Sequence, residues 1–467
     1  MNLTKLFKTG IILILFNVLC TKLAAQETIN TITFTLHTDD VNLWFDATAN
    51  EEYTIDWGDG TIETKTGGSG DLSLFHIYTI HNEYTVTIAG STPDCRFTYC
   101  SFGTLIGYPI SHLTLSGCSD LEILDCNFGK LRELDLSGCP KLTHLTCSNN
   151  YLSDLDLSGC PKLMDLKCYN NQIINLDLTG CSELTSLGCS ENQVSSLDLS
   201  GCPKLTSLIC DNNQISSLDL FGCPKLTSLN CSNNQINSLD LSRCPELQKL
   251  TCANNQLTRL DLTGCFELQE LYCYNNQLPL TELFAAHLLI DNRDRKYLGG
   301  QYMPPLTVKT GEELFADQSV INGIFTHYAV MQNGNHVSTN DYTVVDGKLI
   351  FNTIGQYTVV MSNDAIVSHP GFYAGVEIEI TVEKGTGITN TTQNSIMVYP
   401  NPATNEIYVK LNSQQVTNYA IYNIRGQQVK RGRLQEESNI NIQSLLKGIY
   451  YIKLDDKDNR TISFIKK

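Results

Sequence analysis

The sequence lacks the local signatures of the common enzyme classes. It contains no GxSxG, HExxH, Walker loop or dinucleotide-binding fingerprint. Its nine histidines are scattered along the chain, and only His112 and His144 fall in or beside the repeats described below. A catalytic triad could still assemble in space, because triads are defined by geometry and not by order along the chain. Without a local signature, we predict no enzymatic activity, no catalytic residue and no cofactor.

Further absences narrow the class of protein. No CxxC pair occurs among the 19 cysteines, which removes the strongest sequence signal for a zinc site. After residue 25, no stretch reaches 18 consecutive apolar residues, so we expect no transmembrane segment in the mature chain. The chain is also short of positive charge, with a formal net charge of −17. An acidic chain is a poor ligand for nucleic acid, and we expect none as a partner.

The middle of the chain contains two columns of cysteine, each recurring every 21 residues. A fixed period in this range indicates a solenoid, because one short unit cannot bury its apolar face without stacking on copies of itself. The first column is Cys118, Cys139, Cys160, Cys181, Cys202, Cys223, Cys244 and Cys265, and the second is Cys126, Cys147, Cys168, Cys189, Cys210, Cys231, Cys252 and Cys273.

One repeat unit, residues 142–161, reads LTHLTCSNNYLSDLDLSGCP. Its first half resembles the leucine-rich repeat, in which a short strand turns at an inward asparagine. Its second half repeats the same spacing, so we predict two short strands in each coil, with alternate residues pointing inward. Over residues 105–290 the repeats most resemble the internalin-like bacterial leucine-rich repeats. The 21-residue period and the cysteine in place of a strand leucine depart from that family, so no ligand can be inferred from the resemblance.

The remaining constant columns have structural interpretations. The asparagine at the turn, as in Asn150, is expected to satisfy buried backbone groups. We expect the 16 repeat cysteines to be buried thiols, because side chains stacked in register point alongside one another. For Cys95 and Cys100, outside the columns, a disulfide and free thiols both stay open. A further column contains aspartates, and these carboxylates are expected to repel one another, which raises some of their pKa values. They either bind calcium or, as we favour, accept hydrogen bonds at the turns. They are Asp135, Asp156, Asp177, Asp198, Asp219, Asp240 and Asp261.

Two outward columns change from coil to coil, as a recognition surface requires. One contains Lys167, Ile209 and Tyr272, and the other contains Tyr169 and Tyr274. Tyrosine presents an apolar ring and a polar tip, which suits it to contact proteins or sugars. We predict these five residues as candidate binding residues, with an ordinary solvated surface as the alternative.

The two ends of the chain predict its destination. Residues 1–25 have two lysines, an apolar run and Ala24-Ala25 at the end, which is typical of a secretory signal peptide. Residues 396–467 contain three ordered motifs, VYPNPAT, IYNIRGQ and LKGIYYIK, which resemble the type IX secretion C-terminal sorting domain. That resemblance implies an immunoglobulin-like β-sandwich, secretion across the outer membrane, and a location at the cell surface or outside the cell. Its sorting-motif residues are Pro400, Asn401, Pro402, Gly426, Gly448 and Tyr450.

Two further domains flank the repeats. Residues 26–95 contain TIDWGDGT followed by His76-x-Tyr78, and resemble a PKD-type β-sandwich. Here Asp56, Asp59 and Glu63 could form a calcium site, but the glycines more simply mark a tight turn. We expect a capping helix over residues 283–289, a second immunoglobulin-like sandwich over 305–384 and a linker over 385–395.

The predicted fold is therefore mainly β: a leucine-rich-repeat solenoid of about eight 21-residue coils flanked by immunoglobulin-like sandwiches. The expected function is an exported interaction protein at the cell surface, adhesin-like, which binds a protein or glycan on a host or bacterial surface. The alternative is a carbohydrate-binding or substrate-capturing accessory protein. The type IX secretion machinery is the other expected partner, and no metal site is predicted.

Overall fold

The computed structural model describes residues 29–68, 73–102, 110–290, 292–370, 373–385, 396–399, 403–411, 417–423, 427–435, 437–455 and 461–467. The predicted signal peptide lies outside the described residues, as does all but the first residue of the predicted linker. The chain divides into two compact units, residues 1–203 and 204–467. Among the described residues, no helix has both the length and the apolar character needed to span a membrane.

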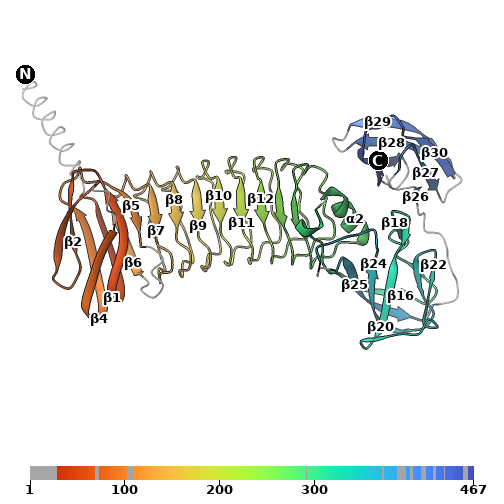
Figure 1. Ribbon diagram of the computed structural model, residues 1–467, viewed down its shortest axis with the longest axis horizontal. Coiled ribbons are helices and arrows are strands. Elements are labelled where there is room, and N and C mark those ends of the chain that lie inside the picture. The colour runs from red at the N-terminus through yellow and green to blue at the C-terminus, as the bar shows by residue number, and fades with distance from the viewer. Residues whose placement is uncertain are drawn as a thin grey trace, which may run out of the picture. The chain divides into compact units, whose positions relative to one another are not determined.

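The first unit begins with an antiparallel sheet in the order β5-β1-β4-β2-β3, and β6 also pairs with β1 (Figure 1). Buried and partly exposed side chains alternate along β1, as a strand with one face on the core requires. Ile32, Phe34 and Leu36 are buried, and the residues between them are partly exposed. The strands are β1 (Thr31–Ala47), β2 (Glu52–Asp56), β3 (Ile62–Thr66), β4 (Ser73–Gly90), β5 (Phe97–Ser101) and β6 (Ile110–Ser116).

The sheet leads directly into the coils, because β5 pairs in parallel with the first coil strand. Each coil then contributes one strand, of three residues in all but the last, which has two. The strands stack in register, so that Leu145 lies beside Leu166. In the first unit these strands are β7 (Ile123–Asp125), β8 (His144–Thr146), β9 (Asp165–Lys167) and β10 (Ser186–Gly188). The second unit has β11 (Ser207–Ile209), β12 (Ser228–Asn230), β13 (Lys249–Thr251), β14 (Glu270–Tyr272) and β15 (Lys296–Tyr297).

The prediction of a second strand in each coil is wrong. In the described part of the solenoid, the second halves form one isolated β-bridge, between Leu218 and Leu239. The inward leucines are nevertheless buried as expected, for example Leu155 and Leu157. The backbone is too strongly turned to form a ladder, because local acceptors take its amides. The Ser158 amide donates to the Asp156 side chain, and the amides that follow donate within tight turns.

The asparagine column performs the predicted task. Asn150 Nδ2 donates to the Cys126 and Cys147 carbonyls at 2.9 and 3.1 Å, and its Oδ1 accepts the Leu131 amide at 3.0 Å. The residue before each of these asparagines has a positive φ, between 50° and 57°, which lets the chain leave the strand abruptly. One side chain therefore satisfies backbone groups of two successive coils.

All 18 described cysteines are buried free thiols, which confirms the prediction for the 16 in the repeats. Burial raises the pKa of Cys139 to about 11 and that of Cys160 to about 12. Cys95 and Cys100 are free thiols as well, so of the two alternatives left open for them the structure has free thiols and not a disulfide. Cys100 lies on β5 beside Leu124, so its thiol joins the interior of the solenoid.

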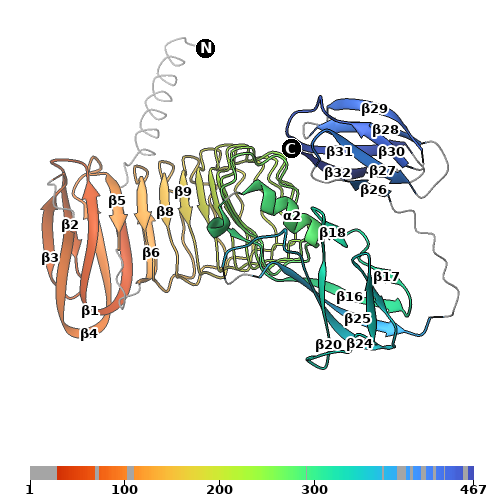
Figure 2. The same ribbon diagram turned by 45° about the vertical axis from the view of Figure 1, so that its right-hand side comes forward.

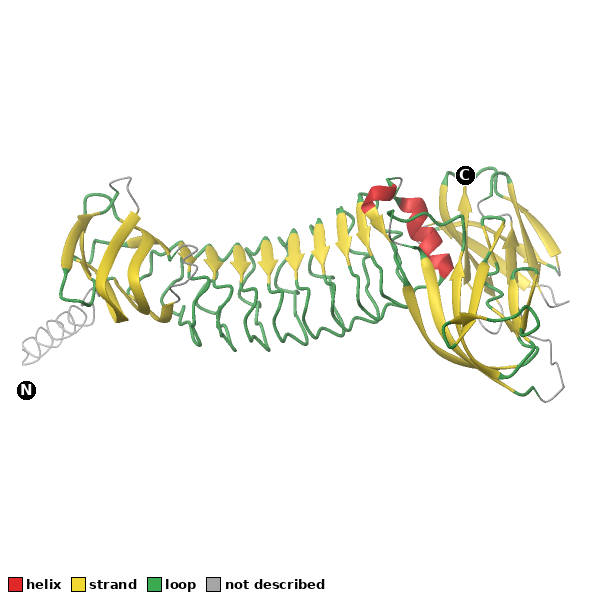
Figure 3. Cartoon of the chain, turned by 60° about the horizontal axis from the view of Figure 1, so that its bottom comes forward, coloured by secondary structure: helices red, strands yellow, loops and turns green. Residues whose placement is uncertain are grey.

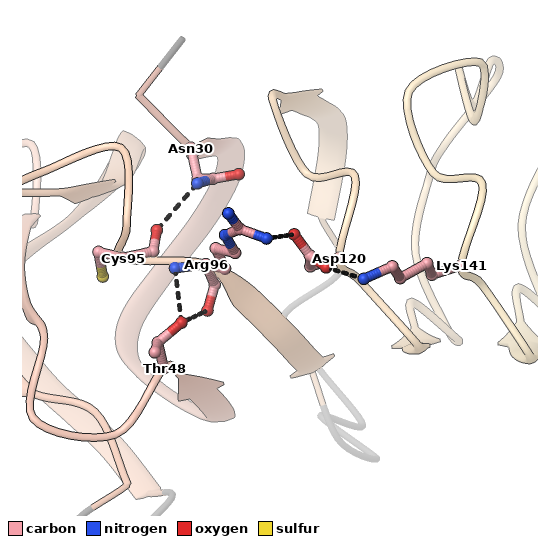
Figure 4. A network of polar contacts seen from close by, with 6 residues as sticks. All are labelled: Asn30, Thr48, Cys95, Arg96, Asp120 and Lys141. Carbon is pink, nitrogen blue, oxygen red and sulfur yellow. Dashed lines mark hydrogen bonds and ion pairs between the residues drawn. The ribbon is translucent and has the colours of Figure 1, made fainter. Parts of the chain in front are cut away.

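Polar contacts join the first sheet to the first coils (Figure 4). Arg96 donates to Asp120 at 3.2 Å, and Lys141 from the next coil bonds the other oxygen of the same carboxylate. The hydrogen bond from Lys141 and the nearby Arg96 lower the pKa of Asp120. On the sheet side of Arg96, Asn30 Nδ2 donates to the Cys95 carbonyl at 2.9 Å, and the Arg96 amide donates to Thr48 Oγ1 at 3.0 Å.

In the second unit, helix α2 (Leu280–Leu289) covers the last coil and confirms the predicted capping helix (Figure 2). It buries Leu280, Leu283 and Phe284. After a short 3₁₀ turn (Arg293–Arg295), Lys296 on β15 is only 2% exposed. Its Nζ donates to the carbonyls of His287 and Ile290 at 3.0 and 2.7 Å, where the helix leaves carbonyl groups without helical partners.

Two pairs of sheets complete the second unit. The first pair is a five-stranded sheet, β16-β25-β24-β20-β21, and a three-stranded sheet, β17-β23-β22. Their bounds are β16 (Gln301–Lys309), β17 (Glu313–Leu314), β20 (His327–Gln332), β21 (Asn335–His336), β22 (Tyr342–Val345), β23 (Lys348–Phe351), β24 (Gly355–Ser362) and β25 (Gly375–Glu383). A separate hairpin joins β18 (Val320–Ile321) to β19 (Ile324–Phe325).

The second pair of sheets lies in the C-terminal domain, in the orders β26-β27-β30 and β29-β28-β31-β32. Both sheets contribute to one core, in which Ile407, Ile421 and Phe464 are completely buried. The strands are β26 (Ile396–Tyr399), β27 (Glu406–Leu411), β28 (Thr417–Asn423), β29 (Gln428–Leu434), β30 (Glu437–Asn441), β31 (Gly448–Asp455) and β32 (Thr461–Lys466). The domain boundaries expected from the sequence, and the immunoglobulin-like and PKD-type identities of the flanking domains, stay predictions.

Candidate interaction surface

The coil strands of each unit lie side by side along one face of the solenoid, with the turns and second halves elsewhere (Figure 3). We call the outward side chains of these strands, together with the residue two positions after each strand, the strand face. Its framework is constant, because every three-residue coil strand places a buried leucine in its centre. The outward positions on either side of that leucine carry different side chains in different coils.

In the first unit, the strand face contains an ion pair with an unsatisfied oxygen. Lys167 Nζ lies 3.1 Å from Asp165 Oδ2, so the two outward side chains of β9 pair with each other. Asp165 Oδ1 is buried without a hydrogen-bond partner among the described residues. An unsatisfied buried acceptor costs about 1–3 kcal/mol of stability.

Tyr169 lies across the next coil at a position where that coil has no side chain. A Cβ atom built on Gly188 would lie 2.0 Å from the Tyr169 hydroxyl oxygen, so the tyrosine ring occupies the space that any other residue would fill. Gly188 is the single glycine of its column. The backbone of Tyr169 is fixed in turn, because its amide donates to Ser148 Oγ at 3.1 Å. The predicted binding residues Lys167 and Tyr169 thus lie on one coil of one surface.

In the second unit, the strand face ends in a stack of three rings. Tyr272 stacks on Tyr297 with a centroid distance of 4.4 Å, and Tyr297 stacks on His369 at 4.2 Å. Lys249 from the preceding coil lies 5.7 Å from the centroid of the Tyr272 ring. Glu270 pairs with Lys249 at 3.1 Å and with Arg295 at 3.7 Å. Burial, followed by the nearby Glu270, raises the pKa of the Tyr272 hydroxyl.

Sequence reasoning found Tyr272 but missed Tyr297 and His369. Tyr297 pairs with Tyr272 across β14 and β15, 25 residues further along the chain, so helix α2 breaks the 21-residue register that defines the columns. His369 comes from a loop between β24 and β25, which no repeat pattern could assign. The other two predicted residues, Ile209 and Tyr274, are half-buried on the same surface, and the Tyr274 Cβ atom packs closely against Gly299.

The aspartate column lies off the strand face and is structural. Each of the seven carboxylates accepts the amide of the residue two positions on, as Asp135 accepts the Ser137 amide at 2.9 Å. The expectation that mutual repulsion raises some of their pKa values is not met. Hydrogen bonds from the Ser137 side chain and amide lower the pKa of Asp135, and comparable bonds lower those of Asp156, Asp177, Asp198 and Asp240.

The N-terminal DWGDG segment forms the tight turn that we favoured. Gly58 and Gly60 have φ values of 84° and 92°, and the Asp56 side chain accepts the Gly58 amide at 2.9 Å. Asp59 pairs with His76 at 2.9 Å, and the His76 ring stacks on the buried Trp57. Within the described residues, no group of three His, Cys, Asp or Glu side chains is arranged to hold a metal ion.

Of the sorting-motif residues, Pro400, Asn401, Pro402 and Gly426 lie outside the described residues. Gly448 begins β31 with a φ of 153°. Tyr450 is 6% exposed and donates from its hydroxyl to the Leu446 carbonyl at 2.9 Å. Both residues therefore contribute to the fold of the C-terminal domain.

Comparison with protein families identifies two segments of the chain. Residues 397–467 match the secretion system C-terminal sorting domain. Residues 182–222, 203–243 and 224–264 match the family of leucine-rich repeats in pairs. The chain thus contains leucine-rich repeats and a type IX secretion sorting domain, which indicates export to the outer membrane or cell surface. A comparison with curated protein sequences found no significant match.

Solved structures of leucine-rich-repeat proteins resemble parts of the chain. An internalin from Listeria monocytogenes is 23% identical over 40% of this chain and 55% of its own, with a TM-score of 0.36. The functional domain of InlJ from the same organism, described as including a cysteine ladder, is 19% identical over 57% of this chain and 77% of its own, with a TM-score of 0.26. YopM from Yersinia enterocolitica is 30% identical over 34% and 39%, with a TM-score of 0.28. The chain thus spans about half of the length of that internalin structure.

Proposed function

We propose that the chain is a non-enzymatic, adhesin-like interaction protein, whose strand face binds a protein on a host or bacterial surface after export. The observation that carries this proposal is the contrast between columns of the same coils. The leucine, cysteine and asparagine positions are constant because the interior requires them, whereas the strand face changes side chains from coil to coil. The interior fixes none of these outward positions, so their side chains are free to match a partner.

The chemistry of the strand face suits a protein partner. Tyrosine and charged side chains with little freedom lose little entropy on binding, and here Tyr169 is seated over Gly188 while Tyr272 is stacked on Tyr297. The ion pair between Lys167 and Asp165 adds partly exposed charged groups to the same surface. These features are the rigid aromatic anchors and polar groups that dominate binding energy at protein interfaces.

The test is a binding screen with the full chain immobilised. Host matrix proteins, glycans and bacterial cell surfaces serve as probes, and a variant with Lys167, Tyr169, Tyr272 and Tyr274 all changed to Ser is run alongside. We expect a protein or cell-surface ligand whose binding the variant loses. A variant with Phe266→Ser, at a 62% exposed position that does not belong to the strand face, is the control. Equal binding by the wild-type chain and the fourfold variant would contradict the proposal.

A further inference from the structure

A second candidate site lies on the second halves of two adjacent coils, away from the strand face. Two columns there contain small residues in almost every coil: one has Ser or Thr two positions after the aspartate, and the next has Gly. The exceptions are Phe221 in the first column and Arg243 in the second. They occur in neighbouring coils, and the Arg243 guanidinium lies 4.9 Å from the centroid of the Phe221 ring.

The fold requires neither Phe221 nor Arg243 at its position. Phe221 is 68% exposed, so its ring contributes little to the interior. It also replaces a hydroxyl that elsewhere donates to the aspartate, as the Ser242 hydroxyl does to Asp240. A Cβ atom on Gly264, one coil after Arg243, would meet nothing closer than 3.5 Å, so the column accommodates a side chain here without needing one.

The two side chains line a hollow of about 290 Å³ together with Asp219, Asp240 and Ser242. The β-bridge between Leu218 and Leu239 joins the backbones immediately before the two aspartates. Each carboxylate accepts one turn amide, that of Phe221 for Asp219 and that of Ser242 for Asp240, both at 2.9 Å. Asp240 also accepts the Ser242 hydroxyl. A carboxylate accepts about four hydrogen bonds, so both keep capacity for a ligand.

We propose that this hollow binds one unit of a neutral saccharide. The chemistry discriminates among ligands, because the lining carries two negative charges and one positive charge. Asp219 and Asp240 together outweigh Arg243, so the lining repels an anionic ligand. An organic cation has donors only, so it leaves the donors of the Arg243 guanidinium without an acceptor. A sugar is neutral, donates hydroxyls to the carboxylates, accepts from the guanidinium, and places its C–H face on the exposed phenylalanine ring. The volume lies just below the range of about 300–1,000 Å³ that is usual for small-molecule pockets, which suits a single sugar unit.

This site is independent of the proposed function, since it shares no residue with the strand face. Its test is a glycan array of neutral and sulfated oligosaccharides, followed by calorimetric titration of the full chain with the neutral oligosaccharide that binds best. Phe221→Ser and Arg243→Gly each restore the residue that the other coils have, so both variants are expected to fold. We expect Phe221→Ser to weaken binding at least tenfold and Arg243→Gly to weaken it severalfold.

The matched control is Phe266→Ser, which makes the same chemical change at an exposed position outside the hollow. It is expected to leave the affinity unchanged, as is Tyr169→Ser on the strand face. Binding of sulfated sugars alone, an equal loss in Phe221→Ser and Phe266→Ser, or no neutral saccharide binding at all would overturn the proposal. Loss of the sugar in Tyr169→Ser would assign it to the strand face instead.

Discussion

The asparagine column shows how one residue type stabilises a coil with no second strand. Asn234 donates to the carbonyls of Cys210, Cys231 and Ser232, all at 3.1 Å, and accepts the Ile215 amide at 2.9 Å. These carbonyls and this amide belong to two coils, and water cannot replace the side chain because it is 9% exposed. The same arrangement recurs from coil to coil, so the energy of stacking depends on it.

Replacing Asn234 by Ala is expected to destabilise the chain by about 2–4 kcal/mol, because buried backbone groups lose their partners. Thermal unfolding and hydrogen exchange at the Ile215 amide measure the effect. Asn237→Ala, at an exposed position three residues away, is the control and is expected to change little. Equal effects of the two substitutions would show that the column is dispensable.

The buried thiols define a second property at the residue scale. A pKa of about 11 at Cys139 leaves roughly one thiolate per thousand molecules at pH 8, and the thiol is also enclosed. We therefore expect iodoacetamide at pH 8 to leave all 18 described cysteines unmodified in the native chain and to modify them in guanidinium. Mass spectrometry counts the adducts. Rapid modification of repeat cysteines under native conditions would contradict the packing described above.

At the scale of elements, the end of helix α2 is held by a buried lysine and a histidine. Lys296 Nζ lies 2.9 Å from His287 Nδ1, and His287 Nδ1 also accepts the Val367 amide at 3.3 Å. Burial first, and then the charge of Lys296, lowers the pKa of His287 below its ordinary value of about 6.5. Neutral His287 thus connects helix α2 to Lys296 on β15 and to Val367 in the loop before β25.

The sign of the resulting pH dependence follows from proton uptake. Because His287 binds a proton more readily in the unfolded chain, its contribution to stability is complete above about pH 6.5 and is lost as the pH falls towards the folded pKa. We expect the melting temperature of wild type to fall more between pH 7.5 and 5.5 than that of His287→Gln. His336→Gln, at an exposed histidine, should behave as wild type. An identical pH response of wild type and His287→Gln would contradict this assignment.

Elements differ in how far the sequence alone predicts them. The coils and their inward asparagines follow from periodicity, because every inward position repeats a chemical requirement. The capping helix follows from the apolar run over residues 283–289, where the repeat pattern ends. The second strand of each coil was predicted wrongly, since leucine spacing does not reveal that an aspartate takes the Ser158 amide. Tyr297 and His369 could not be predicted, because their contact with Tyr272 depends on where α2 and a distant loop return the chain.

At the scale of the whole molecule, the chain combines leucine-rich repeats, for which we propose binding, with a sorting domain for delivery. The sorting domain indicates export to the outer membrane or cell surface, and the repeats present a surface that varies while its interior does not. Of the predicted binding residues, Lys167 and Tyr169 are brought together on β9 and its following turn, and Tyr272 is joined to a ring stack. The repeat pattern could predict the face, but not the geometry of its side chains.

The most direct test of the central claim is a comparison of two glycine substitutions. Gly188→Ala places a methyl group where the Tyr169 ring lies, whereas Gly180→Ala, in the same unit, places one where no atom lies within 4 Å. The dissociation constant of the full chain for the protein or cell-surface ligand found in the screen is measured for both. We predict that Gly188→Ala binds at least fivefold more weakly than wild type, and that Gly180→Ala binds with the wild-type affinity. Equal affinities of both variants and wild type would contradict binding through the strand face.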